Sequence, residues 1–478
     1  MVDEPRRTRR RTRHAARDLG GRDRRALRGR RTRAGSLTMT TQSASTLLIV
    51  DYNLSRVDDV AHLARYARER YGARTVLIRS GPGERDRRIC DDVIDLDPLA
   101  DGFVDAALAR LADIASDLRA GIVFSDNAVQ QGAALLERLG LAVDSAPLAQ
   151  GAFSKHAYRV AEHRVRALLE AQRVMVPDYA EAASVDDLRR FAADHPGGFV
   201  VKPSCEGNNR GVVVVRDGDS LEAAFSEVAP YLSRGVICEA FIPFAREFSF
   251  DGLGALSFTT EKVSATGRYP VEVAQILPSR LAAHEADTLT RAGRLANLLV
   301  GQRDGPFHNE IKLSDDGLRA AVVEPNRRPA GMKIWWLARW AYGVDLFHAW
   351  IDAAWGGAPP PTLPPPGRFA AAVMLGVAED QSFSSQDVRI DASPLDDAIA
   401  DTARMLGLRD GALQARSFEW LSAERRFVHA IARDNADFVA LACITLETGD
   451  ADIRDVVATL RANWPAALCA ACETRAAA

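Results

Sequence analysis

Lysine is almost missing from this chain of 478 residues, which carries 61 lysine and arginine residues in total. Only five of them are lysines, and all five lie between positions 155 and 333: Lys155, Lys202, Lys262, Lys312 and Lys333. A coding bias toward arginine explains why lysine is rare, but it does not explain why the lysines cluster. Because a compact ammonium and a planar guanidinium bind ligands differently, the cluster marks a region in which to look for chemistry.

Long apolar runs and a regular pattern of cysteines are also missing. No stretch approaches the ~18 apolar residues that a membrane-spanning helix needs, and the first apolar run, Thr46–Val50, is too short for a signal peptide. The six cysteines are scattered, and the C-x-x-C pair of Cys469 and Cys472 has no second pair or histidines beside it. We therefore expect a soluble cytoplasmic protein without a membrane span, a disulfide framework or a zinc site.

Charge is divided unevenly along the chain. Residues 1–38 contain 14 arginines against four acids, whereas the rest of the chain is acidic. An arginine-rich block can bind nucleic acid through phosphate contacts, but this one has no interleaved aromatic residues and no apolar periodicity. We predict that residues 1–45 form a disordered extension, and we do not expect a nucleic-acid partner.

The hydrophobic pattern predicts a multidomain protein of the α/β and α+β classes. Residues 46–150 predict a parallel α/β domain with strands at Leu47–Val50, Thr75–Ile78, Val93–Leu96 and Gly121–Phe124 and helices at Val57–Tyr71 and Phe103–Leu118. Residues 151–357 predict an α+β domain with helices at Lys155–Gln172, Ser220–Leu232 and Trp335–Trp340 and strands at Phe199–Pro203, Val212–Val215, Val236–Phe241 and within Phe248–Phe258.

A third part follows a proline-rich stretch. Residues 358–367 hold six prolines and predict a stiff linker. Residues 368–478 predict a C-terminal α+β subdomain with strands at Ala370–Val377, Phe427–Ala432 and Phe438–Thr445 and helices at Leu395–Leu406 and Ala451–Arg461.

Nucleotide chemistry is indicated by two segments of the central domain. Lys202 lies in an apolar β run and is followed by a loop of small residues, a combination that can clamp a phosphate because loop amides meet phosphate oxygens. Another strand ends at Glu239, Phe241 and Ile242, where backbone groups can meet an adenine edge, and Glu247 beyond it can bind ribose hydroxyls. Each piece alone is more often an ordinary solvated strand end.

The strongest group lies on two further expected strands. They present Glu310, Glu324 and Asn326, oxygen ligands of the hard kind that Mg²⁺ prefers. Arg328 beside them can neutralise charge on a transferring phosphoryl group. The alternative, a surface strand pair with scattered acids, does not explain the order of lysine, small loop, strand glutamate and then this group.

These motifs, in this order, resemble the ATP-grasp superfamily and specifically its carboxylate–amine ligases, over residues 46–345. The resemblance implies an ATP-grasp fold preceded by an N-terminal parallel α/β (pre-ATP-grasp) domain. It also implies the following roles: Lys155 and Lys202 bind ATP, Glu239, Phe241 and Ile242 lie at the adenine, Glu247 lies near the ribose or metal, Glu310, Glu324 and Asn326 bind Mg²⁺, and Arg328 is catalytic.

Two positions depart from the family pattern. The phosphate loop carries Asn208, Asn209 and Arg210 where many members are richer in glycine. Asp126 stands where relatives often have glutamate, at the end of an expected parallel strand where ligands gather. Asp126 is therefore a candidate substrate contact, although an N-cap role explains it equally well.

Substrate contacts are indicated more weakly. The segment from Lys262 to Pro270 resembles the lining of the acceptor pocket in amino-acid ligases, so Arg268 is a candidate for gripping a substrate carboxylate. A solvated loop arginine is an equal alternative. Trp335 and Trp336 could wall a substrate pocket, but aromatic residues at a helix start are more often core.

The resemblance implies an ADP-forming ligase that uses ATP and two Mg²⁺ ions, with Mn²⁺ as a substitute. It would activate a substrate carboxylate as an acyl phosphate and couple it to an amine of an amino acid or peptide. Two alternatives stay open: loading of an amino acid onto a carrier-protein thiol, and a catalytically silent nucleotide-binding module. A homodimer is a further option, because members of this superfamily are often dimers.

Overall fold

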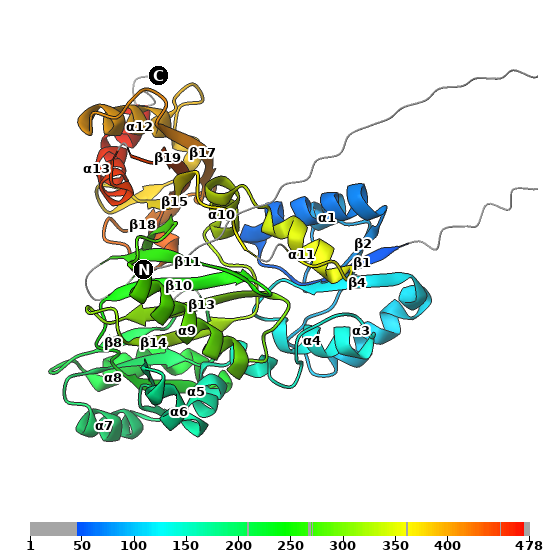
Figure 1. Ribbon diagram of the computed structural model, residues 1–478. Helices are drawn as coiled ribbons and strands as arrows, with labels where there is room; N and C mark the ends of the chain where they lie inside the picture. The colour runs from blue at the N-terminus through cyan, green and yellow to red at the C-terminus, as the bar shows by residue number, and fades with distance from the viewer. Residues whose placement is uncertain are drawn as a thin grey trace, which may run out of the picture. The chain divides into compact units, whose positions relative to one another are not determined.

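The computed structural model describes residues 45–207, 210–265, 269, 271–359, 362–449 and 451–472 (Figure 1). Of the predicted extension, residues 1–44 lie outside the described residues, as do two prolines of the predicted linker, Pro360 and Pro361. None of the helices in these ranges combines the length and the apolar character that crossing a membrane requires.

The first domain is a parallel α/β sheet, as predicted. Its strand order is β3-β2-β1-β4, and every neighbouring pair is parallel. The elements are β1 (Thr46–Val50), α1 (Val57–Tyr71), β2 (Arg74–Arg79), α2 (Glu84–Ile89), β3 (Asp92–Asp95), α3 (Phe103–Leu111), β4 (Leu118–Val123) and α4 (Val129–Arg138).

The prediction of one helix over Phe103–Leu118 is wrong in its second half. Helix α3 ends at Leu111, residues 112–117 form a 3₁₀ turn, and Leu118 begins β4. Leu118 is buried and pairs with Thr46 of β1. The apolar side chain that suggested a longer helix face therefore belongs to the sheet.

A four-stranded antiparallel sheet follows, with the order β6-β9-β7-β8. Its strands are β6 (Tyr179–Glu181), β7 (Phe199–Pro203), β8 (Val213–Val215) and β9 (Val236–Ala240), and its helices are α7 (Val185–Asp194) and α8 (Leu221–Val228). The preceding helix, predicted as continuous to Gln172, is interrupted at Val165, which separates α5 (Lys155–Arg164) from α6 (Arg166–Ala171).

The third sheet has nine strands, in the order β17-β19-β15-β12-β11-β10-β13-β14-β5, and only β5 and β14 pair in parallel. The strands are β5 (Val174–Met175), β10 (Arg246–Leu253), β11 (Leu256–Ser264), β12 (Glu272–Leu277), β13 (Pro306–Leu313), β14 (Ala320–Asn326), β15 (Arg368–Leu375), β17 (Leu413–Trp420) and β19 (Ala440–Glu447). Because β15 pairs with β12, the strands beyond the proline-rich stretch continue the central sheet.

Helices cover this sheet, and a small two-stranded sheet adjoins it. The helices are α9 (Ala283–Leu299), α10 (Ile334–Tyr342), α11 (Leu346–Ala354), α12 (Pro394–Met405) and α13 (Ile453–Cys472). The small sheet pairs β16 (Gln381–Phe383) with β18 (Arg426–Val428), so the strand predicted over Phe427–Ala432 ends at Val428.

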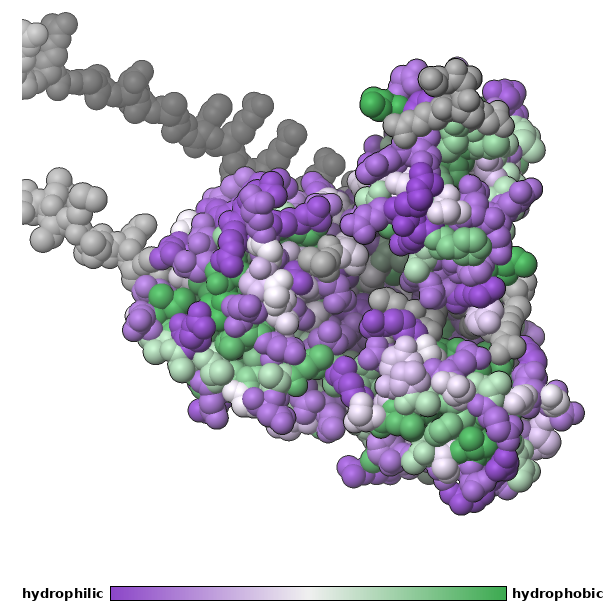
Figure 2. Space-filling view, turned by 180° about the vertical axis from the view of Figure 1, so that it is seen from behind, coloured by the Kyte–Doolittle hydropathy of each residue, from purple (hydrophilic) through white to green (hydrophobic). Residues whose placement is uncertain are grey.

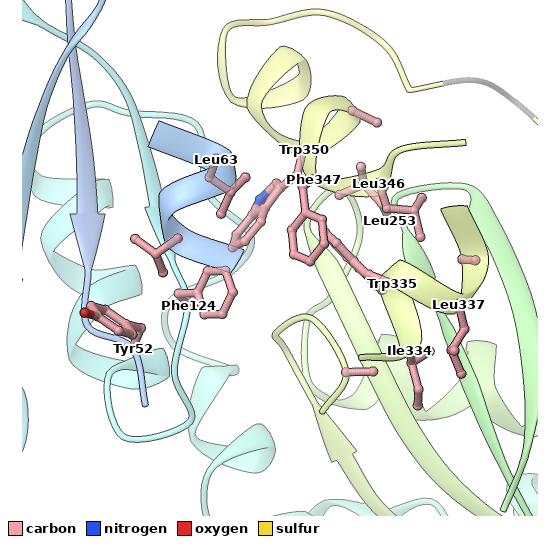
Figure 3. Packing of buried hydrophobic residues seen from close by; sticks show 14 of the residues in the cluster. Tyr52, Leu63, Phe124, Leu253, Ile334, Trp335, Leu337, Leu346, Phe347 and Trp350 are labelled. Carbon is pink, nitrogen blue, oxygen red and sulfur yellow. The ribbon is translucent and has the colours of Figure 1, made fainter. Parts of the chain in front are cut away.

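Aromatic side chains join the first domain to helices α10 and α11. Phe124 lies 5.7 Å from Trp350 between ring centroids, and Trp335 packs edge-on against Trp350 and Phe347 (Figure 3). Trp335 is 1% exposed, so it belongs to the core and does not wall a pocket.

On the face shown in Figure 2, hydrophilic residues predominate and hydrophobic ones form small groups.

Candidate active site

The start of α5 places the first predicted ATP lysine against a metal acid. The Ser154 hydroxyl accepts a hydrogen bond from the amide of Ala157 and so caps the helix. The Lys155 amide donates to the carbonyl of Ser204, which ties this helix start to the small-residue loop. Lys155 Nζ then lies 2.7 Å from Glu324 Oε2. The lysine and the acid, predicted 169 positions apart, are therefore in direct contact.

The second predicted ATP lysine is buried on β7. Lys202 is 5% exposed, and its Nζ lies 2.7 Å from Oε2 of Glu239 on the neighbouring strand β9. Burial lowers the pKa of Lys202. Burial alone would raise the pKa of Glu239, but the charges of Arg159 and Lys202 outweigh it and lower that pKa to about 2. The side chain of Glu239, which the sequence predicted to lie at the adenine, is therefore paired with Lys202.

Sequence reasoning missed Arg159, which completes this charged group. Its side chain is fully buried, with Nε 2.9 Å from Glu239 Oε1 and a terminal nitrogen 2.9 Å from the carbonyl of Val323. It also pairs with the buried Glu162. The signal was present in the sequence, because Lys155, Arg159 and Glu162 recur at helical spacing and put charges on one helix face.

The two predicted metal acids face each other across paired strands. Glu310 of β13 is the register partner of Glu324 of β14. Lys262 Nζ lies 3.0 Å from Glu310 Oε2, and the amide of Asn326 donates to Glu324 Oε1 over 3.3 Å. Burial would raise the pKa of both carboxyls, but the charges of Lys262 and Lys155 lower it. Both acids are therefore ionised at neutral pH and suit a divalent cation.

His308, for which the sequence predicted no role, lies beside Glu310. His308 Nδ1 lies 2.7 Å from Asp251 Oδ1, and its Nε2 lies 3.6 Å from Glu310 Oε1. The hydroxyls of Ser249 and Thr260 both donate to the other oxygen of Asp251. Burial lowers the pKa of His308, but Asp251 outweighs it and raises the pKa to about 9. The histidine is therefore protonated at neutral pH.

Arg328 meets the predicted substrate residue of the first domain. Its Nε lies 2.7 and 2.8 Å from the two carboxylate oxygens of Asp126, which follows β4 as the sequence predicted. Burial lowers the pKa of Arg328, but Asp126 and then Glu324 raise it. The first domain and the strand pair of the metal acids thus share one cluster of charges.

The remaining predicted residues lie around this cluster. Lys312 Nζ lies 2.9 Å from Oε1 of Glu247 in β10, and the Ser264 hydroxyl donates to Oε2 of the same residue over 2.7 Å. Phe241 and Ile242 directly follow β9 and are half-buried. Arg268, predicted to grip a substrate carboxylate, lies outside the described residues, as do Asn208 and Asn209 of the phosphate loop.

The lysine cluster of the sequence has a common structural feature. Each of the five lysines lies within 3.3 Å of a glutamate oxygen, in the pairs Lys155–Glu324, Lys202–Glu239, Lys262–Glu272, Lys312–Glu247 and Lys333–Glu419. The first four glutamates belong to the cluster just described or flank it. Four of the five lysines therefore serve one charged region, and Lys333 pairs elsewhere, with Glu419 of β17.

Comparison with known proteins confirms the predicted fold. Residues 167–293 match the model of the ATP-grasp domain. A structure of an L-amino acid ligase from Bacillus licheniformis superposes with a TM-score of 0.66 at 16% identity, covering 88% of this chain and 98% of that one. A comparison with curated protein sequences finds no match.

Two further structures share the architecture. N5-carboxyaminoimidazole synthetase from Staphylococcus aureus, complexed with ADP, gives a TM-score of 0.59 at 15% identity over 87% of this chain and 97% of its own. The biotin carboxylase domain of the Hydrogenobacter thermophilus 2-oxoglutarate carboxylase, a complex with MgADP and bicarbonate, gives 0.54 at 15% identity over 84% and 86%. At these identities the likeness shows the fold.

Proposed function

We propose, from the ATP-grasp fold that this chain has, that it is an ATP- and Mg²⁺-dependent carboxylate–amine ligase acting on amino acids or peptides. The observation that carries the proposal is the cluster in which Lys155 contacts Glu324, Glu324 pairs in register with Glu310, and the charges of both acids act on Arg328. Together with Lys202, these cations and ionised carboxylates are groups suited to phosphoryl transfer to a carboxylate.

The residues fit the nucleotide and its metal. Lys155 and Lys202 would hold ATP phosphates, while Phe241 and Ile242 would meet the adenine. Glu310, Glu324 and Asn326 would hold Mg²⁺, because their oxygens are of the hard kind it prefers and both carboxylates are ionised. When bound, the metal would neutralise phosphate charge. One or two ions are compatible with this set.

The chain's own residues would do the rest by positioning. An oxygen of the substrate carboxylate attacks the γ-phosphorus of ATP, the bond to the bridging oxygen breaks, and ADP leaves. The amine then attacks the acyl carbon, loses a proton and expels phosphate, which leaves an amide. Arg328, held by Asp126, would offset charge on the transferred phosphoryl group and on the departing phosphate.

The choice of an amino acid or peptide substrate is supported by the likeness to the L-amino acid ligase. The other neighbours are an N5-carboxyaminoimidazole synthetase and a biotin carboxylase domain complexed with bicarbonate, so fold alone does not select the substrate. Products formed from ATP, Mg²⁺ and an amino-acid mixture, identified by mass spectrometry, would define it.

Phosphate release tests the proposal directly. We expect Lys202→Ala and Glu324→Ala to lower ATP-dependent phosphate release by about 10²–10³-fold, because each removes charge at the transferring group. Glu261→Ala is the matched control, since Glu261 lies on the same sheet but points to its opposite face. Full turnover in either site variant would refute the assignment.

The same assay separates the alternatives. Phosphate release with free amino acids alone supports ligation, whereas release only when a carrier protein is added indicates thiol loading. If ATP binds and no phosphate is released under either condition, the chain is a nucleotide-binding module and the proposal fails.

A further inference from the structure

The turn that follows Arg328 contains two adjacent residues in the left-handed region. Met332 has a φ of 43° and Lys333 a φ of 59°. Side chains with a Cβ rarely adopt this conformation, and two in succession persist only when the surroundings hold them. The same turn leads from Arg328 into α10, which begins at Ile334. Its shape therefore fixes where the arginine stands relative to the helix.

The first domain holds this turn on one side. A terminal nitrogen of Arg56 donates to the carbonyl of Pro329 over 3.3 Å. Asp59, on the following helix α1, accepts a hydrogen bond from Trp336 Nε1 over 2.6 Å. These contacts fix the two ends of the turn, and Asp59 also acts on the left-handed pair: burial lowers the pKa of Lys333, but the charges of Asp59 and then Glu419 raise it.

The C-terminal subdomain holds the left-handed pair. Lys333 Nζ lies 3.3 Å from Oε2 of Glu419, and the lysine side chain is only 14% exposed. Glu419 belongs to β17, the edge strand of the nine-stranded sheet. Lys333 thus ties the turn to a residue that lies 86 positions later in the chain.

The register of the sheet places Glu419 on the face that carries the metal acids. One row of paired positions runs across six strands through Glu247, Lys262, Gln275, Ala372, Cys443 and Ser417. Successive side chains of a strand alternate between faces, so Glu419, two positions from Ser417, shares this face. The C-terminal strands therefore continue this face of the sheet, where Ala372 and Cys443 are buried in the apolar core that includes α10.

We propose that Lys333 and Glu419 are a positioning pair, through which the C-terminal subdomain holds the turn at Met332 and Lys333 and so orients Arg328 for phosphoryl transfer. The inference rests on the proposed ligase function for the role of Arg328. It gives the subdomain a task in the reaction, although neither residue touches the reacting atoms.

A matched control pair exists on the other face of the same sheet. Arg454 of α13 makes two contacts to Glu261 of β11, of 2.7 and 2.8 Å. This pair also joins the C-terminal subdomain to the central strands. Because Glu261 precedes Lys262 in β11, its side chain points away from the metal acids, so the control has the same connectivity without touching the turn.

Amide hydrogen exchange tests the positioning without any need for activity. We expect Glu419→Gln and Lys333→Met to speed exchange of the amides of residues 330–337 by about five- to ten-fold, because losing a charged contact loosens the turn locally. Glu261→Gln should leave these amides unchanged. Equal exchange in all variants and the wild type would overturn the inference.

Kinetics then connects the turn to Arg328. If wild-type protein releases phosphate, Glu419→Gln should lower kcat by about ten-fold or more, since small misplacements of a charged group are costly, while KM for ATP stays within about two-fold. An unchanged kcat with loosened amides would overturn the catalytic role. If the wild type releases no phosphate, the proposed function fails, whereas the exchange result still decides whether the pair holds the turn.

Discussion

The two faces of the nine-stranded sheet bury different chemistry within the same strands. In β10, Glu247 points to the site, while Phe248 and Phe250 point to the core behind it. In β13, Glu310 faces the site and Ile311 the core. Since adjacent residues of one strand serve opposite faces, substitutions one position apart should separate catalytic defects from loss of stability.

The four-stranded sheet repeats the contrast. In β9, Cys238 belongs to an apolar core, whereas the next residue, Glu239, meets Lys202 and Arg159. Buried charges of this kind are tolerated only when they are paired. The charged faces of both sheets are therefore balanced internally before any ligand arrives, which explains how so many ionised groups remain in one folded region.

The largest effect on stability should come from the core side. Phe250 is 1% exposed, stacks on Phe307 at 5.1 Å between centroids, and leaves no room for a Cβ at Gly293. We expect Phe250→Ala to lower the free energy of unfolding by about 3–5 kcal/mol, because it opens a cavity. Denaturant titration measures this loss.

Activity completes the test of that variant. The fraction of Phe250→Ala that stays folded should release phosphate at nearly the wild-type rate, because the ring faces away from the metal acids. A defect in activity larger than the loss of folded protein would show that the two faces are coupled.

The stability that the charged face contributes should instead depend on pH. The pKa of Glu239 falls from 4.5 in the unfolded chain to about 2 in the folded protein, because the charges of Arg159 and Lys202 outweigh burial. A depressed carboxyl pKa stabilises the fold above about pH 4.5, and that stability is lost as the pH falls through about 2. The shift corresponds to about 3 kcal/mol.

Two variants isolate this contribution. Glu239→Gln should be strongly destabilised at pH 7, since Arg159 and Lys202 lose their counter-charge, and its difference from the wild type should shrink between pH 4.5 and pH 3. The deficit of Phe250→Ala should stay constant over the same range. A constant deficit in both variants would contradict the assigned pKa.

Local patterns in the sequence were enough to predict much of the fold and to name candidate site residues. Short apolar runs located the parallel strands of the first domain, the residue types around Glu324 and Arg328 suggested metal and phosphoryl chemistry, and the family resemblance added Lys155. These signals are local, because strand period, helix caps and motif spacing each span only a few residues.

What could not be predicted depends on pairing between distant segments. The path of β15 back to β12, across the proline-rich stretch, leaves no periodic trace in either strand. The apolar side chain of Leu118 suits a helix or a strand, and only the pairing of Leu118 with β1 shows that it belongs to a strand. The contact between Lys333 and Glu419 likewise appears only once the C-terminal strands join the sheet.

The smallest effects should come from exchanging lysine for arginine, which tests whether the lysine cluster is functional. Lys202→Arg must place a bulkier guanidinium beside Glu239, where the lysine side chain is 6% exposed, whereas the Lys312 side chain is 28% exposed. We expect about a ten-fold loss in kcat/KM for ATP at Lys202 and at Lys155, from overpacking and a displaced charge, and a change within two-fold at Lys312. Initial rates at varied ATP measure it. All three variants keep the charge. If the three substitutions change kcat/KM equally little, the lysines cluster by chance and not for function.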